Sequence, residues 1–263
     1  MGQLGLCLRA AYNGASSADK PGADGWETAG ALALLGRVMP NPVGNRILSR
    51  LSRANLALLR PHLEAVDLPL LMQLEVANSR IDTVYFIDHG FASVVADGPG
   101  KRDLEVGLIG RESMTGLAVV LGHDRARHTT YMQAAGAGQR IRATKLRKAV
   151  AESASLRQAL LRCVNAFLIQ TTETALANGR SKNEERLARW LLMADDRIDG
   201  GEVPLTHKLL GVMLGVQRSN VTATVQALER EGLIKAGLRV ITILDREGLV
   251  RFSNGAYVAS DTE

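Results

Sequence analysis

Cysteine is scarce in this chain of 263 residues, which has only Cys7 and Cys163. Two thiols are too few for a disulfide framework, a structural zinc site or an iron-sulfur cluster held by one chain. A run of about 18 uninterrupted apolar residues, as a membrane-spanning helix needs, is also missing. The first ten residues lack the charged and apolar parts of a secretory signal. These absences predict a cytoplasmic protein.

Enzyme signatures are missing as well. The chain has no phosphate-binding P-loop, no G-x-S-x-G nucleophile elbow and no His/carboxylate cluster at metal-ligand spacing. The glycine-rich pieces Gly98–Gly100 and Gly136–Gly138 are interpreted as turns. We therefore expect neither an enzyme nor a bound metal. The 32 Lys and Arg exceed the 27 Asp and Glu, and the net charge of +5 suits a polyanionic partner.

Composition divides the chain. Residues 11–30 are rich in Gly, Ala, Ser and Asp, which predicts a disordered extension over residues 1–43. Apolar spacing from Ile47 to Leu63 predicts short helices interrupted by Pro61. Between Val66 and Ile141 short strand-like runs, such as 83–87 and 92–95, are broken at 89–90, 97–100 and Gly107. This texture predicts a β-barrel or jelly-roll sensor domain over residues 44–150.

A long helix is expected from Leu156 to Ala177, with apolar residues on two stripes. Leu156, Leu160, Cys163 and Phe167 form one stripe, and Leu161, Val164, Leu168 and Ala175 form the other. One stripe can cover the barrel while the other meets a partner helix, so residues 151–180 are predicted to be a dimerisation helix. The alternative is a helix buried within one chain. Gly179 is expected to end this helix, and the capping-box pattern of residues 181–184 to start another, Glu184 to Asp196.

A winged helix-turn-helix is predicted between Leu205 and Ile243, within a domain of residues 181–263. Thr206 can cap a helix whose buried face holds Leu209, Leu210, Met213 and Leu214; Gly215 supplies the turn, and a second helix runs to Gly232. The runs 233–235 and 239–243 are interpreted as a two-stranded wing. A helical hairpin that binds no nucleic acid is the alternative.

A recognition helix presents its first turns to base edges in the major groove of duplex DNA. The predicted base-reading residues are therefore Arg218, Ser219, Asn220, Thr222 and Ala223. Phosphate contacts, which fix register without reading sequence, are predicted for Thr206, His207, Lys208, Gln217 and Arg239.

The order of barrel, long helix, hinge and LTHKLLGVMLGVQRSNVTATVQALEREGLI resembles the Crp/Fnr family of bacterial regulators over residues 47–243. The segments IDTVYFIDHGFASVVA and NEERLARWLL support the resemblance. It implies an α+β fold with an N-terminal β jelly roll of the cyclic-nucleotide-binding type, a dimerising helix and a C-terminal winged helix-turn-helix. It also implies a homodimer that binds DNA and contacts RNA polymerase at promoters.

Departures from the family concern the ligand pocket first. Relatives that bind cyclic AMP carry a Gly-Glu-Leu element and an Arg followed by Ser or Thr. Here Gly116 stands in place of that Glu, before Leu117, and His128–Thr129 stands in place of the Arg-Ser pair. A neutral histidine has one ring donor where arginine has a fixed fork. We therefore expect no ordinary cyclic AMP response, which leaves room for another small effector.

The resemblance gives six candidate ligand-binding residues: Gly116, Leu117, His128, Thr129, Thr171 and Thr172. The last two lie where hydroxyl groups of the long helix meet the nucleotide base in family members. A redox cluster is disfavoured, since Cys7 is the only N-terminal cysteine. Haem ligation stays open through His62, His89, His123 and His128.

The DNA-reading positions depart too. Ser219 stands where many members have Glu, and Ala223 where the catabolite activator protein has a second Arg. Neither residue can make the contacts of those side chains. The operator is therefore expected to be a two-fold site that differs from the usual one, with half-sites one helical turn apart. The alternative function is a ligand-sensing module that acts through protein–protein contacts.

Overall fold

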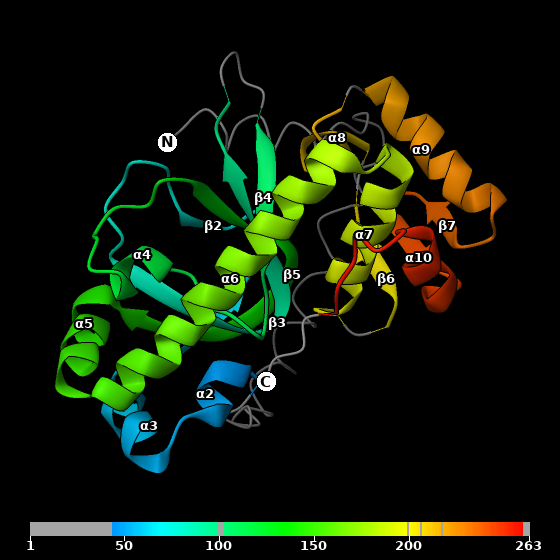
Figure 1. Ribbon diagram of the computed structural model, residues 1–263. Coiled ribbons are helices and arrows are strands. Elements are labelled where there is room, and N and C mark those ends of the chain that lie inside the picture. The colour runs from blue at the N-terminus through cyan, green and yellow to red at the C-terminus, as the bar shows by residue number, and fades with distance from the viewer. Residues whose placement is uncertain (1–43, 99–102, 199, 206, 217, 260–263) are drawn as a thin grey trace, which may run out of the picture.

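The computed structural model describes residues 44–98, 103–198, 200–205, 207–216 and 218–259. The predicted extension of residues 1–43 lies outside this part of the chain. The predicted α+β class is confirmed: a β-sheet domain comes first, a long helix follows, and a helix-turn-helix with a small sheet lies in the C-terminal part (Figure 1). The strands are β1 (Glu64–Leu68), β2 (Gln73–Glu75), β3 (Thr83–Ala96), β4 (Leu104–Ile109), β5 (Thr129–Arg142), β6 (Glu202–Pro204), β7 (Ile234–Gly237) and β8 (Val240–Ile243). The helices are α2 (Arg46–Arg50), α3 (Arg53–Leu59), the 3-10 turn η1 (Arg60–His62), α4 (Leu117–Val120), α5 (Ala143–Glu152), α6 (Ala154–Arg180), α7 (Asn183–Asp195), α8 (His207–Leu214), α9 (Arg218–Arg230) and α10 (Arg246–Phe252).

The N-terminal region, predicted to be the sensor, is built on one antiparallel sheet. Its order is β1-β5-β3-β4, and β2 also pairs with β5. The long central strands β3 and β5 run side by side and are bent by irregularities in their register between residues 87 and 92. The jelly-roll connectivity of this region stays a prediction.

Three of the expected turns are wrong. His89–Gly90 lies inside β3, Gly107 lies inside β4, and Gly136–Gly138 lies inside β5. A Cβ added to Gly136 would lie 1.9 Å from the His89 carbonyl oxygen, so the glycine permits a close approach of two bent strands. The expected turn at 98–100 falls mostly outside the described residues.

Helix α6 crosses the sensor sheet diagonally (Figure 1). Leu156, Leu160 and Cys163 are buried in the core beneath it, and Phe167 packs against a second cluster inside the sheet. This confirms the predicted barrel-facing stripe. The helix continues one residue beyond Gly179 and ends at Arg180.

The C-terminal region begins with α7, where Glu185, rather than the predicted Glu184, accepts a hydrogen bond from the Lys182 backbone N–H at 2.9 Å. Helices α8 and α9 are joined through Gly215, whose φ of +63° is the left-handed conformation that a glycine tolerates. The wing has three strands in the order β6-β8-β7, one more than predicted. Sequence analysis missed β6 because it has only three residues and ends on Pro204.

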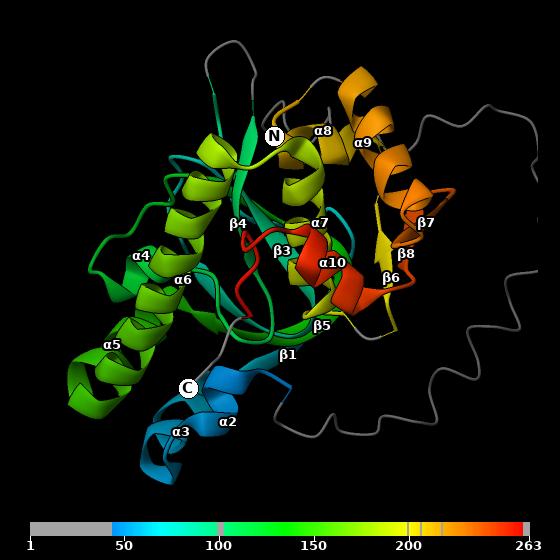
Figure 2. The same cartoon turned by 45° about the vertical axis from the view of Figure 1, so that its right-hand side comes forward.

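One hydrophobic core joins the two halves of the molecule. Phe91, Leu108 and Ala134 of the sensor sheet belong to the same buried cluster as α7, α8, α9 and the wing. Figure 2 shows α7 lying between the sheet and α9. None of the helices in the described ranges is long and apolar enough to cross a bilayer.

Candidate functional site

The recognition helix α9 has one buried and one exposed face. Val221, Val225 and Leu228 pack into the shared core against α8. Asn220 and Ala223 lie on the opposite, exposed face. Because the apolar residues face α8, the side of α9 that points away from the molecule is open to a partner (Figure 2).

The structure describes only part of the predicted DNA-binding set. Asn220, Ala223 and Arg239 are exposed, and Thr222 is half-buried. Thr206 and Gln217 lie outside the described residues, as do the side chains of His207, Lys208, Arg218 and Ser219, whose backbone is helical. The exposed part of α9 and the wing turn therefore form one candidate nucleic-acid interface.

The wing tip adds a residue that sequence analysis missed. Leu238 is 93% exposed, next to Arg239, which has a φ of +63° in the turn between β7 and β8. A strongly exposed leucine at the tip of a hairpin has an apolar surface that can meet a groove wall or a thymine methyl group. In the sequence Leu238 lies between the two predicted wing runs, 233–235 and 239–243, where an exposed position is expected.

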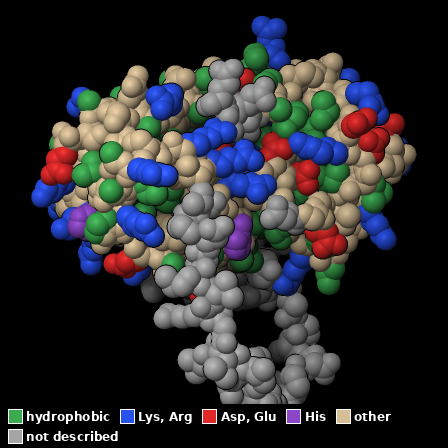
Figure 3. All heavy atoms as spheres, turned by 90° about the horizontal axis from the view of Figure 1, so that it is seen from below, with side chains coloured by type: hydrophobic (Ala, Val, Ile, Leu, Met, Phe, Trp, Pro, Cys, Tyr) green, Lys and Arg blue, Asp and Glu red, His purple; other side chains and the backbone are tan. Residues whose placement is uncertain are grey.

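Positive charge is not confined to the winged domain. Figure 3 views the molecule from below, on the side where α2 and α3 lie, and shows Lys and Arg side chains gathered near the middle of this face. Exposed arginines of this segment are Arg46, Arg50, Arg53 and Arg60. Net charge alone therefore does not locate the DNA surface.

The loop around Gly116 is bonded to a carboxylate of the chain itself. Gly116 has a φ of +70° at the start of α4, and its backbone N–H donates to Glu75 Oε1 at 3.0 Å. Thr130 donates its hydroxyl to Glu75 Oε2 at 2.7 Å. Burial raises the pKa of the Glu75 carboxyl, although these two hydrogen bonds lower it. Glu75 was missed because nothing in its sequence neighbourhood marks it.

The predicted ligand-binding hydroxyls are engaged elsewhere. Thr129 is buried and accepts the Ala77 backbone N–H at 3.3 Å. Thr171 and Thr172 both donate to the Leu168 carbonyl of their own helix at 2.8 Å. His128 is half-buried, and so is Leu117, which packs against the sensor core.

The remaining histidines do not gather into a metal site. His62, His89 and His123 are all exposed. Within the described ranges, no group of three or more His, Cys, Asp or Glu side chains could hold a metal ion.

An open cavity of about 610 Å³ lies beside α6. Residues of α2, α6, α7 and the segment after α10 line it, among them Arg50, Arg162, Phe167, Met193 and Val258. Its size suits a small molecule. None of the six predicted ligand-binding residues lines it.

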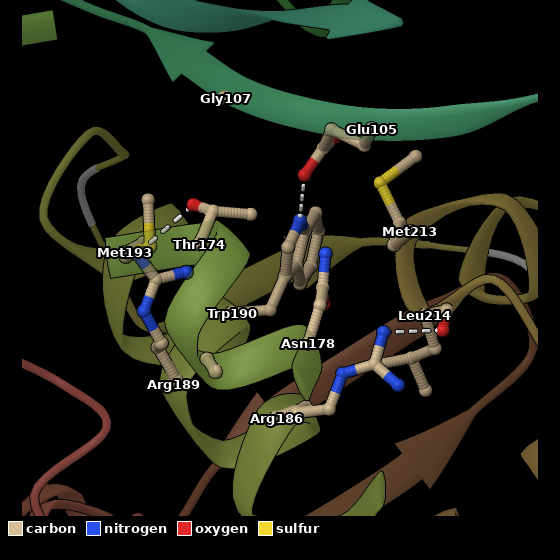
Figure 4. A pocket seen from close by; sticks show the side chains of 11 residues that line it. Glu105, Gly107, Thr174, Asn178, Arg186, Arg189, Trp190, Met193, Met213 and Leu214 are labelled. Atoms are coloured by element: carbon tan, nitrogen blue, oxygen red, sulfur yellow. Dashed lines mark hydrogen bonds between the residues drawn. The ribbon is translucent and has the colours of Figure 1, made fainter. Parts of the chain in front are cut away.

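The sensor sheet and α7 meet through a buried polar contact. Trp190 of α7 donates its indole N–H to Glu105 Oε1 of β4 at 2.5 Å (Figure 4). The Trp190 ring also meets Phe91 of β3 edge to face, with centroids 6.2 Å apart. A second contact joins Arg197 to Glu112 at 2.7 Å, with both side chains largely buried. Sequence analysis named none of these four polar residues as functional.

The α8–α9 turn touches the sheet at a third point. A Cβ added to Gly215 would lie 2.9 Å from Leu104 Cδ1, so this turn packs directly on β4. A cavity of about 20 Å³, enough for about one water molecule, lies between these elements and is lined by Glu105, Trp190, Arg186 and Leu214 among others.

Comparison with known proteins agrees with this architecture. Residues 185–252 match the family model of the Crp-like helix-turn-helix domain. A solved structure of a putative transcriptional regulator of the Crp/Fnr family from Eubacterium rectale superposes with a TM-score of 0.65 at 16% identity, covering 81% of this chain and 99% of that one. FixK2 from Bradyrhizobium japonicum gives a TM-score of 0.63 at 18% identity, covering 75% and 98%.

The structure of the c-di-GMP-responsive global regulator CLP of Xanthomonas campestris superposes with a TM-score of 0.61 at 15% identity, covering 73% of this chain and 99% of that one. No curated protein sequence matches the chain. The fold is similar to that of solved regulators of the Crp/Fnr type, with a β-sheet region before a winged helix-turn-helix. Residues 185–252 are a Crp-like helix-turn-helix domain, which agrees with the resemblance found in the sequence.

Proposed function

We propose that the protein binds a two-fold DNA operator as a homodimer and reads its sequence through α9. The observation that carries this proposal is the exposed outer face of α9, with Asn220 and Ala223, in a domain whose other face is fixed in the core. Arg218, at the start of the same helix, is the proposed guanine reader, because its guanidinium can bond two acceptors of one base.

The proposed dimer uses the outer side of α6. Leu161, Leu168, Ile169 and Leu176 are between 40% and 63% exposed on this helix. Spacings of seven and eight residues place Leu161, Leu168 and Leu176 on one side of a helix. A second copy of α6 would cover these side chains and bring two recognition helices into one complex, as a two-fold operator requires.

We further propose that the sensor no longer takes cyclic AMP in the usual way. Glu75 already occupies the Gly116 backbone N–H and the Thr130 hydroxyl. A carboxylate at this position repels a phosphate anion when it is ionised. A different small effector would find room in the 610 Å³ cavity beside α6.

Binding to duplex DNA as salt is raised tests the proposed function. Fragments recovered from the genome by the purified protein supply the operator, and a scrambled duplex of equal length is the control. We expect specific affinity to fall steeply with salt, because Lys and Arg contacts to phosphates release counterions. Recovery of no fragment at low salt, or equal affinity for recovered and scrambled duplexes, would overturn the proposal and favour a module that acts through protein contacts.

The remaining assignments depend on this function. We assign residues 44–150 to the sensor, 151–180 to the dimerisation helix and 181–263 to the winged domain, in a cytoplasmic protein that contacts RNA polymerase. Transcription with purified polymerase on the recovered operator tests that contact. A change in transcript yield that requires both the operator and the regulator is the expected result.

A further inference from the structure

Glu105 is a buried carboxylate shared between the two halves of the molecule. Ser93 of the neighbouring strand β3 donates its hydroxyl to Oε2 at 2.5 Å, and Trp190 of α7 donates its indole N–H to Oε1 at 2.5 Å. Figure 4 shows the carboxylate of β4 pointing at the indole of α7. One oxygen is therefore held by the sensor sheet and the other by the output domain.

Few charges compensate this carboxylate. Two cations act on it: Arg189 of α7, whose guanidinium donates to Thr174 of α6, and Arg197 just after α7, which pairs with Glu112. Arg186 lines the same cavity and donates to the Leu214 carbonyl of α8. Each arginine thus has its hydrogen bonds directed to another group.

The sheet contributes no cation near Glu105 among the described contacts, only hydroxyl groups and a second carboxylate. Tyr131 of β5 has a buried hydroxyl without a hydrogen-bond partner among the described residues, and burial, followed by the charges of Glu105 and Asp103, raises its pKa. Ser93 of β3 is the only polar donor that this strand gives to Glu105 in the described contacts. The groups that the sheet places around Glu105 therefore do not neutralise the negative charge of its carboxylate.

We propose that Glu105 is a proton-responsive latch that holds the winged domain on the sensor sheet when it is protonated and loosens that contact when it is ionised. The geometry carries this assignment, because undocking α7 would return the carboxylate to water while docking removes it from water. Loosening would also release the contacts of Gly215 with Leu104 and of Trp190 with Phe91.

The direction follows from the two environments. Burial raises the pKa of Glu105 from 4.5 to about 7, although the bonds from Ser93 and Trp190 and the charges of Arg189 and Arg197 lower it. An undocked, hydrated Glu105 has its ordinary pKa. Between these two values the docked form binds more protons, so docking weakens as pH rises through this window and stays weak above it. The docking equilibrium is expected to fall by up to about two orders of magnitude.

The consequence for DNA depends on the proposed function. In the latched form the outer face of α9 remains exposed, so the latch does not cover the reading surface. It fixes the orientation of α9 relative to α6, which two recognition helices need in order to meet two half-sites. We therefore expect operator binding to weaken as the latch opens.

Fluorescence of Trp190 tests the latch without DNA. The chain has two tryptophans, so a Trp26→Phe background leaves Trp190 alone. Trp190 is 5% exposed, and acrylamide quenching is expected to rise with pH, with a midpoint between about 4.5 and about 7. Glu105→Gln, which cannot ionise, should abolish this rise, whereas Glu64→Gln on exposed β1 should leave it intact.

A second variant guards against misfolding of Glu105→Gln. Ser93→Ala removes one hydrogen bond to the ionised carboxylate, so the midpoint should move to higher pH. Quenching that is independent of pH in the parent would overturn the latch. A pH transition that persists in Glu105→Gln would also overturn the latch, because another group, such as a histidine, would then cause it. An unchanged midpoint in Ser93→Ala would overturn it as well.

Operator affinity measured at pH 6 and pH 8 then tests the coupling. We expect weaker binding at pH 8 in the parent and equal binding at both values in Glu105→Gln. Equal pH dependence of both proteins would refute the coupling even where quenching supports the latch. Loss of all DNA binding at both values would instead count against the proposed function, while the quenching result still decides the latch.

Discussion

Replacement of Leu168 with alanine tests the proposed α6 interface. The side chain is 61% exposed, and full burial of a leucine contributes about 2 kcal/mol, so covering the exposed part contributes about 1 kcal/mol. A two-fold interface contains the residue twice, which makes the expected loss about 2 kcal/mol per dimer. This corresponds to a dimer Kd that is roughly thirtyfold weaker.

Sedimentation equilibrium over a range of protein concentrations measures this change. Leu121→Ala is the matched control, because Leu121 is 56% exposed but follows α4 and does not belong to α6. Helix content by circular dichroism should be equal in both variants. A dimer Kd that stays within threefold of the parent for Leu168→Ala, or an equal weakening by Leu121→Ala, would refute the assignment of this surface.

The remaining predictions concern single residues. Glu75→Ala should lower the free energy of unfolding by about 1 to 3 kcal/mol in urea titrations, because it leaves two donors without their acceptor; an unchanged midpoint would contradict it. Gly136→Ala should destabilise by about 2 kcal/mol or more in the same assay, whereas Gly179→Ala, with nothing within 4 Å of an added Cβ, should stabilise α6 by up to about 1 kcal/mol. Arg218→Ala should reduce specific DNA binding more than binding to a scrambled duplex, and equal losses would argue against base reading.

Periodic parts of the fold could be predicted from the sequence. The buried stripe of α6 and the packing of α8 on α9 follow from apolar residues at helical spacing, which is local information. Turn assignment failed at Gly136–Gly138 for a physical reason. Glycine marks both a turn and a place where two backbones meet closely, and only the partner strand distinguishes them.

The polar contacts could not be predicted in the same way. Glu105 and Trp190 are 85 positions apart, and each has an ordinary sequence neighbourhood, a short strand and an amphipathic helix. Glu75 reaches Gly116 across 41 positions. The family resemblance gave the position of Gly116 but could not supply its partner, because Glu75 lies outside the motif.

The carboxylates of Glu75 and Glu105 differ in where their donors lie, and this difference separates stability from regulation. Both donors to Glu75 belong to the sensor, so its loss should weaken that region without changing how the winged domain is held. The donors to Glu105 come from β3 and from α7, so a change there alters the relation between the two halves even when each half stays folded. A pH response that is present in Glu75→Gln and absent in Glu105→Gln would therefore locate the coupling at the contact between β4 and α7, rather than in the predicted ligand pocket.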